Sequence, residues 1–214
     1  VDALVIAVDG PSGVGKSTVS RRVANHFDLD YLDTGALYRA ATLAVLESGV
    51  PRDDHPAVIE VVQAVEVDQH DGVTTLDGED VSRVIRSEAV TSAVSEVSAI
   101  PEVRSVLVEM QRTWVADRGQ RAVVEGRDIG SVVFPDAALK VYLTADPDER
   151  ARRRSGEAGT DHGTTREAIE RRDAYDSSRA VSPLTVADGA IVIDTTDLTL
   201  PEVVDLVIAE ASLV

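Results

Sequence analysis

The chain has 214 residues, of which 43% are hydrophobic and 28% charged, a composition typical of a globular domain. Its formal net charge of −17 argues against a sequence-independent nucleic-acid binder, which needs a basic face to release phosphate counterions. Cysteine is absent, which excludes disulfides and thiolate metal sites, and no apolar run reaches the roughly 18 residues of a membrane span, so we expect a cytoplasmic protein with no membrane partner.

The first elements predict a phosphate-binding loop. Residues 3–8 form an apolar strand candidate, residues 17–27 are compatible with a helix, and the pattern G-x-x-x-x-G-K-S lies between them. Glycines let backbone N–H groups converge on an anion, and the start of a helix favours phosphate. A glycine-rich turn with a solvated lysine is the alternative, but it requires neither flanking element. We therefore expect a triphosphate to bind residues Gly10, Pro11, Ser12, Gly13, Val14, Gly15, Lys16, Ser17 and Thr18.

Within this loop two side chains have distinct expected roles. The Lys16 ammonium would lie against the terminal phosphates, and the Ser17 hydroxyl would ligate the Mg²⁺ that accompanies them.

The next elements indicate an α/β fold. Residues 30–32 form a short strand candidate, and Asp33 or Thr34 can cap a helix that runs to about Ser48. The next clear buried strand begins only at Ala122, much further along than the dozen or so residues that a crossover needs. We therefore expect an inserted subdomain at about residues 50–100.

The insertion contains its own strands. Residues 65–67, 73–76 and the neighbourhood of 80–81 are strand candidates, and the two Asp-Gly turns between them are strong hairpin signals. A helix over 56–64 precedes these strands, and helices over 87–98 and 101–117 follow them. A small antiparallel sheet is the prediction.

Alternation of strands and helices then resumes. Strands are expected at 122–125, 139–143 and 190–194, and helices from Pro147 to Arg154, over 165–177 and over 200–210. Together with the first two strands, this predicts a P-loop NTPase-type three-layer sandwich with a five-stranded parallel sheet, in a single domain over 1–214. The glycine-rich segment 155–164 predicts a loop within a short lid at about 150–170.

Ligands of open parallel sheets bind beyond the carboxyl ends of the strands, so residues at those ends are candidates. Arg127, just after the strand 122–125, is a candidate for a phosphate contact. Either Asp9 or Glu125 is a candidate to hold Mg²⁺ through water.

Arginines gather on both sides of the predicted lid loop. A closing lid must exclude water and bring cations to the transferred phosphoryl group. The alternative for each single arginine is a solvated helical hairpin with local ion pairs such as Arg172–Asp176. The cluster consists of Arg150, Arg152, Arg153, Arg154, Arg166, Arg171, Arg172 and Arg179.

Several separated motifs together resemble the bacterial cytidylate kinase family of nucleoside monophosphate kinases. The resemblance runs nearly end to end. It is carried by D-G-P-S-G-x-G-K-S at 9–17, L-D-T-G-A-x-Y-R at 32–39, G-E-D-V-S-x-x-I-R at 78–86, V-S-A-x-P-x-V-R at 97–104, E-G-R-D-I-G at 125–130, V-F-P-D-A at 133–137 and R-D-x-x-D-x-x-R-x-V-x-P-L at 172–184.

The resemblance implies a monomer that uses MgATP to phosphorylate CMP and dCMP. By position it assigns cytosine recognition to Ser95, Arg104 and Asp128, and the ribose hydroxyls to Arg172 and Asp176. It assigns the acceptor phosphate to Arg39, Arg127 and Arg179, with Thr34 nearby, and the catalytic charges to Lys16, Arg127 and Arg179. Because the acceptor phosphate is itself the nucleophile, no general base is needed.

Two other functions fit the phosphate loop. One is a related kinase acting on UMP or shikimate, and the other is a regulatory switch that binds nucleotide and acts through a partner. The switch leaves Arg39, Arg104, Arg127 and Arg179 without a role. Glu125 stands where the family pattern varies, so its part in holding the metal stays open.

Overall fold

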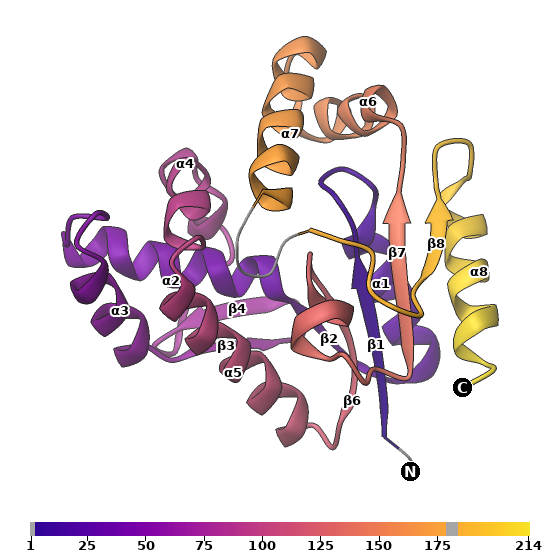
Figure 1. Cartoon of the computed structure of the whole chain (residues 1–214), viewed down its shortest axis with the longest axis horizontal. Helices are drawn as coiled ribbons and strands as arrows, with labels where there is room; N and C mark the ends of the chain where they lie inside the picture. The colour runs from indigo at the N-terminus through magenta and orange to yellow at the C-terminus, as the bar shows by residue number, and fades with distance from the viewer. Residues whose placement is uncertain (1–2, 179–183) are drawn as a thin grey trace. The chain divides into compact units, whose positions relative to one another are not determined.

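The computed structural model of the chain describes residues 3–178 and 184–214, without the side chains of residues 157 and 158 (Figure 1). The chain divides into two compact units. The core unit comprises Val1–Leu32 with Arg118–Val214, and the inserted unit comprises Asp33–Asp117. Among the described residues, no helix combines the length and hydropathy needed to cross a bilayer.

The core unit alternates strands and helices. Its elements are β1 (Leu4–Asp9), α1 (Lys16–Phe27), β2 (Asp30–Asp33), β6 (Arg121–Glu125), a π-helical turn (Ile129–Val133), β7 (Leu139–Thr144), α6 (Pro147–Ala158), α7 (His162–Ser177), β8 (Ile191–Asp194) and α8 (Leu200–Ala211).

Among the described residues, the strands of this unit form one sheet in the order β2-β6-β1-β7-β8. The central strand β1 runs parallel to β6, with Ile6 opposite Val123, and parallel to β7, with Ile6 opposite Leu139. A central parallel strand is covered on both faces, which is why residues 4–8 are apolar throughout rather than alternating. The predicted α/β fold with a five-stranded parallel sheet is confirmed.

One apolar cluster of this unit packs beneath two helices. Val19 and Val23 of α1 and Val203 and Val207 of α8 lie one helical turn apart and pack with Ile6 and other strand residues. Figure 1 shows α8 beside the edge strand β8. The cluster fixes β1, and therefore the loop that follows it, in the centre of the unit.

The inserted unit is mainly helical. It contains α2 (Thr34–Ser48), α3 (His55–Ala64), β3 (Val67–His70), β4 (Val73–Leu76), β5 (Glu79–Asp80), a 3₁₀ turn (Val84–Arg86), α4 (Glu88–Val97) and α5 (Pro101–Asp117).

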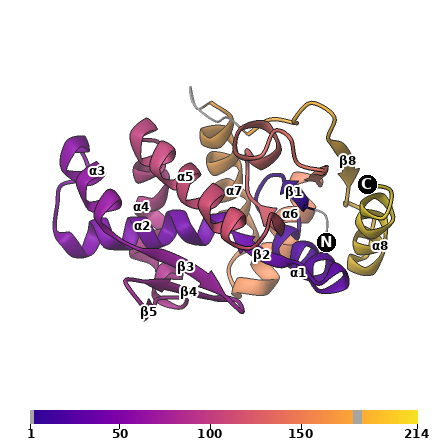
Figure 2. The ribbon, with the colours of Figure 1, turned by 90° about the horizontal axis from the view of Figure 1, so that it is seen from below.

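A small antiparallel sheet in the order β3-β4-β5 confirms the prediction (Figure 2). Its two turns hold Asp71–Gly72 and Asp77–Gly78 at positive φ, as the Asp-Gly pairs predict. The first strand was expected at 65–67 but runs over Val67–His70. The physical reason is that Asp77 closes the turn on Glu66, whose N–H donates to Asp77 Oδ1 at 2.8 Å.

The predicted loop over 155–164 is wrong. Helix α6 continues to Ala158, and α7 begins at His162, so only residues 159–161 separate them. Gly159 ends α6 in a left-handed conformation with φ 64°, and the Asp161 carboxylate accepts the Thr164 N–H at 2.9 Å to begin α7. These caps convert a glycine-rich composition into a tight helical hairpin. The functional division into a substrate-binding part at about 50–100 and a lid at about 150–170 stays a prediction.

Candidate active site

The loop after β1 is bent tightly between two other elements. A side chain at Gly10, whose φ is 146°, would collide with the Leu143 carbonyl oxygen of β7. A Cβ at Gly13 would lie 2.9 Å from the Arg150 carbonyl oxygen of α6. Only glycine allows these approaches, and the loop then enters α1 at Lys16.

Lys16 is folded onto this loop. Its Nζ donates a hydrogen bond to the Pro11 carbonyl oxygen at 2.8 Å. Burial of the ammonium group is the main cause that lowers the pKa of Lys16, the Arg127 guanidinium lowers it further, and Glu125 opposes them. A phosphate oxyanion bound beside Nζ would favour the charged form.

Ser17 and Glu125 form a pair of oxygen ligands suited to Mg²⁺. The Ser17 hydroxyl donates to Glu125 Oε1 at 2.8 Å, and the Tyr31 hydroxyl donates to Glu125 Oε2 at 2.7 Å. Mg²⁺ in nucleotide sites is usually held by one or two protein oxygens together with phosphates and water, and this pair fits that pattern. Among the described residues, no group of three or more His, Cys, Asp or Glu side chains is arranged to hold a metal.

Tyr31 was not predicted as part of the site. It lies on β2, which is the neighbour of β6 in the sheet, and Glu125 ends β6. The contact between Tyr31 and Glu125 could be expected only once β2 was known to lie beside β6.

Asp9 holds the turn after β6 rather than contacting Ser17. Its two carboxylate oxygens accept the N–H groups of Ile129 at 2.8 Å and Gly130 at 2.7 Å. Burial raises the pKa of Asp9 to about 6, although these two hydrogen bonds act in the opposite direction. Of the two carboxylates considered for the metal, Glu125 is therefore the one in contact with the Ser17 hydroxyl.

Arg127 connects this turn to α7. Its Nη1 donates to the Gly10 carbonyl oxygen at 3.3 Å, and its Nη2 lies 3.5 Å from Asp176 Oδ2. The Arg172 Nε lies 3.9 Å from the same oxygen, Asp176 Oδ2. The core unit thus brings together Arg127, Arg172 and Asp176, and Asp128 is buried at the start of the π-helical turn. Arg179 lies outside the described residues.

Two further residues reach the phosphate loop. Asp173 Oδ1 accepts the Ser12 N–H at 3.3 Å and lies 3.4 Å from Arg127 Nη1. Arg150 Nη1 donates to the other carboxylate oxygen of Asp173 and to the Ser12 carbonyl oxygen, the latter at 3.2 Å. Sequence reasoning placed Arg150 only in a cluster and gave Asp173 no role. The sequence does place Asp173 three residues before Asp176, and therefore on the same face of a helix, which could have indicated a role for it.

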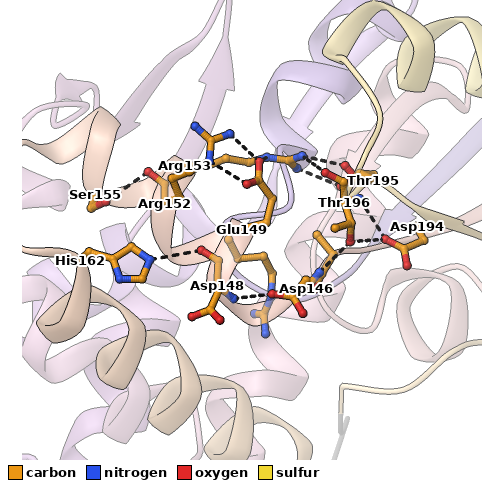
Figure 3. A network of polar contacts seen from close by, with 12 residues as sticks. Asp146, Asp148, Glu149, Arg152, Arg153, Ser155, His162, Asp194, Thr195 and Thr196 are labelled. Carbon is orange, nitrogen blue, oxygen red and sulfur yellow. Dashed lines mark hydrogen bonds and ion pairs between the residues drawn. The ribbon is translucent and has the colours of Figure 1, made fainter.

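Other arginines of the predicted lid make contacts close by or with neighbouring elements. Arg153 donates to Thr195 Oγ1 at 3.0 Å and to the Thr195 carbonyl oxygen at 2.7 Å, and these contacts tie α6 to the turn after β8 (Figure 3). Arg152 pairs with Glu149, and its hydrogen bond lowers the pKa of that carboxyl group. Arg166 pairs with Asp148 and Glu170. Arg152 and Arg166 thus make ion pairs within the helical hairpin, whereas Arg153 binds the turn after β8.

The remaining predicted residues lie in the inserted unit. Arg39 is buried and donates to the Ile85 carbonyl oxygen at 3.0 Å and to Thr91 Oγ1 at 2.9 Å. The buried Arg104 donates to the Ser98 carbonyl oxygen at 3.4 Å, and its guanidinium lies 5.1 Å from the centre of the Tyr38 ring. Thr34 is buried at the start of α2, and Ser95 is half-buried on α4.

Comparisons with known structures support the fold. The chain is similar to a shikimate kinase from Bacteroides thetaiotaomicron, with a TM-score of 0.50, 12% identity and coverage of 98% of both chains. It is also similar to an uncharacterized protein from Eubacterium ventriosum, with a TM-score of 0.56, 12% identity and coverage of 100% of both chains. At this identity the likeness concerns the fold alone.

Comparisons of sequence identify the family and confirm the resemblance. A cytidylate kinase from Streptomyces avermitilis is 49% identical over 213 residues, covering 97% of this chain and 92% of the relative. One from Nocardia farcinica is 51% identical over 211 residues, covering 94% and 90%. The family model described as cytidylate kinase matches residues 6–213. The chain therefore belongs to the cytidylate kinase family.

Proposed function

We propose that the protein transfers the terminal phosphoryl group of MgATP to CMP and dCMP, giving CDP or dCDP and ADP. The observation that carries this proposal is the meeting of the phosphate loop with Arg127, Arg172 and Asp176 in the core unit of a chain from this family. A phosphate loop alone accounts for the donor, whereas the arginines and the carboxylate provide for an acceptor.

The donor half consists of residues 10–18. The loop N–H groups and the Lys16 ammonium bind the triphosphate, and Ser17 with Glu125 would hold Mg²⁺. When bound, the metal neutralises charge on the phosphate oxygens. Tyr31 orients the Glu125 carboxylate through its hydrogen bond.

The residues of the acceptor half are assigned by their position in the family motifs. Ser95, Arg104 and Asp128 would recognise cytosine, whose amino group is a donor and whose N3 and O2 are acceptors. Asp176 and Arg172 would bind the ribose hydroxyls. Arg39, Arg127 and Arg179 would hold the acceptor phosphate, with Thr34 nearby. An acceptor oxygen held in line with the donor phosphate needs positioning and charge neutralisation, not a base.

ADP release with MgATP and a panel of acceptors tests this function. We expect the highest kcat/KM with CMP or dCMP among CMP, dCMP, UMP, AMP, GMP and shikimate, and loss of activity when EDTA removes Mg²⁺. Lys16→Ala should lower kcat by at least about 10²-fold, because a preorganised cation is lost. Equal rates with UMP would contradict cytosine recognition, and ADP release that is independent of any acceptor would contradict a kinase.

The alternatives are less well supported. The chain belongs to a family whose relatives are named cytidylate kinases, so a UMP or shikimate kinase is not favoured. We further propose a cytoplasmic monomer whose partners are ATP and its acceptor nucleotide. Light scattering that gives the mass of a dimer would contradict the monomer.

A further inference from the structure

We propose that Asp173 is a positioning residue for phosphoryl transfer, which holds Arg127 and Arg150 against the phosphate loop. This inference rests on the proposed kinase function. It concerns a side chain that neither the sequence motifs nor the family comparison assigns to a role.

Asp173 joins three segments that are distant in sequence. Its Oδ1 accepts the Ser12 N–H at 3.3 Å and lies 3.4 Å from Arg127 Nη1, while its Oδ2 accepts a hydrogen bond from Arg150 Nη1. Both arginines also donate to the loop itself, Arg127 to the Gly10 carbonyl oxygen at 3.3 Å and Arg150 to the Ser12 carbonyl oxygen at 3.2 Å. Asp173 and the two arginines therefore contact one another and also contact the backbone of the phosphate loop.

These contacts are more buried than the ion pair of Glu170 with Arg166 on the same helix. The side chains of Asp173 and Arg150 are 16% and 8% exposed, whereas those of Glu170 and Arg166, one turn earlier on α7, are 49% and 45% exposed. Exposed i,i+4 pairs contribute little, while partly buried charges interact strongly. Asp176 is also buried and lies near Arg127, but Asp173 accepts the Ser12 N–H of the phosphate loop and pairs with both Arg127 and Arg150.

The chemistry explains why a carboxylate is needed at this point. Two guanidinium groups placed side by side repel each other, and a carboxylate between them offsets that repulsion with one oxygen for each. Backbone N–H groups and arginines are also the donors that stabilise charge on a transferring phosphoryl group. By gathering them, Asp173 sets the positions of the groups that act on the phosphates.

The proposal predicts a specific separation of kinetic effects. Asp173 carries a negative charge beside a site for anions, so removing that charge does not weaken attraction for ATP. Loss of arginine positioning should instead lower kcat, since the transition state depends on it. A general loss of structure would reduce the folded fraction and would be visible in thermal unfolding.

The test compares Asp173→Asn with Glu170→Gln, the same change of carboxylate to amide on the same helix. With saturating CMP, we expect Asp173→Asn to lower kcat by about 10–100-fold while KM for ATP rises less than about twofold. Glu170→Gln should stay within about twofold of wild type in both constants. Wild-type kcat in Asp173→Asn, or a loss of kcat no larger than its loss of folded protein, would overturn the proposal.

Asp173→Glu provides the second variant, because it keeps the charge but shifts the carboxylate by one methylene. We expect a folded protein with kcat between those of wild type and Asp173→Asn. If Asp173→Asn does not fold, Asp173→Glu decides alone, and its wild-type kcat and KM would overturn the proposal. A wild-type protein without CMP-dependent ADP release would overturn the proposed function and this inference together, whereas an active wild type with an equally active Asp173→Asn would overturn this inference alone.

Discussion

The Asp9 carboxylate lies at the end of β1 with only 4% of the residue exposed, and its oxygens bind the N–H groups of Ile129 and Gly130. Its ionised form is disfavoured by burial, which is why its pKa rises to about 6. In the unfolded chain the same group titrates near its ordinary value of 3.8. Between these two values the folded protein holds a proton that the unfolded chain has released.

This difference predicts a pH dependence of stability. As the pH rises through 6, Asp9 must ionise within the fold, so the stability it contributes below that pH is lost. The free energy of unfolding of wild type relative to Asp9→Asn should fall by about 1 kcal/mol between about pH 5 and about pH 7. Urea unfolding of both proteins across this range measures it. A difference that stays constant or rises with pH would show that burial does not govern this carboxyl group.

Residues of the site differ in how far sequence could predict them. Gly10 to Ser17 form a continuous motif, so their local conformation and their expected ligand follow from neighbouring residues alone. Tyr31 and Glu125 are 94 positions apart, and Ser12 and Asp173 are 161 apart. Their contacts depend on strand order and on how α7 packs, which no local pattern encodes.

The α6–α7 hairpin shows how an element can be misread from composition. Gly156 and Gly159 both suggest a loop, but Gly156 lies inside α6, where an added Cβ would meet no atom of another segment within 4 Å, while Gly159 ends α6 at φ 64°. The Asp-Gly turns of the small sheet were predicted correctly because that pair itself demands positive φ. A single glycine does not by itself determine the backbone conformation. Whether it lies in a helix or ends one depends on the capping residues around it.

The two glycines therefore predict opposite effects of the same substitution. Gly156→Ala should raise the free energy of unfolding by up to about 1 kcal/mol, because alanine favours the helix interior and meets no neighbouring atom. Gly159→Ala should lower it by about 1 kcal/mol, because alanine is strained in the left-handed conformation. Chemical denaturation of both variants measures the pair. Equal effects of the two substitutions would contradict the helix end at Gly159.

For the whole molecule, chain spacing and charge were the informative quantities. The long interval between Leu32 and Ala122 indicated an insertion, and Asp33–Asp117 does form a compact unit of its own. Spacing does not assign residues of that unit to the acceptor nucleotide. Arg39 and Arg104, two of the candidates, donate hydrogen bonds to carbonyl oxygens within the unit itself. Their assignment continues to rest on the family motifs.

The net charge of the molecule predicts its response to salt. With 38 acidic residues against 21 Lys and Arg, the formal charge of −17 makes the compact state repel itself, and added ions screen that repulsion. Salt also weakens ion pairs, but exposed pairs such as Arg166–Glu170 contribute little. Raising NaCl from about 0.05 M to about 0.5 M at neutral pH should therefore raise Tm by a few degrees, about 2–5 °C. A fall of Tm with salt would mean that attraction within ion pairs, with the Arg127–Asp173–Arg150 set foremost, outweighs the repulsion of the whole surface.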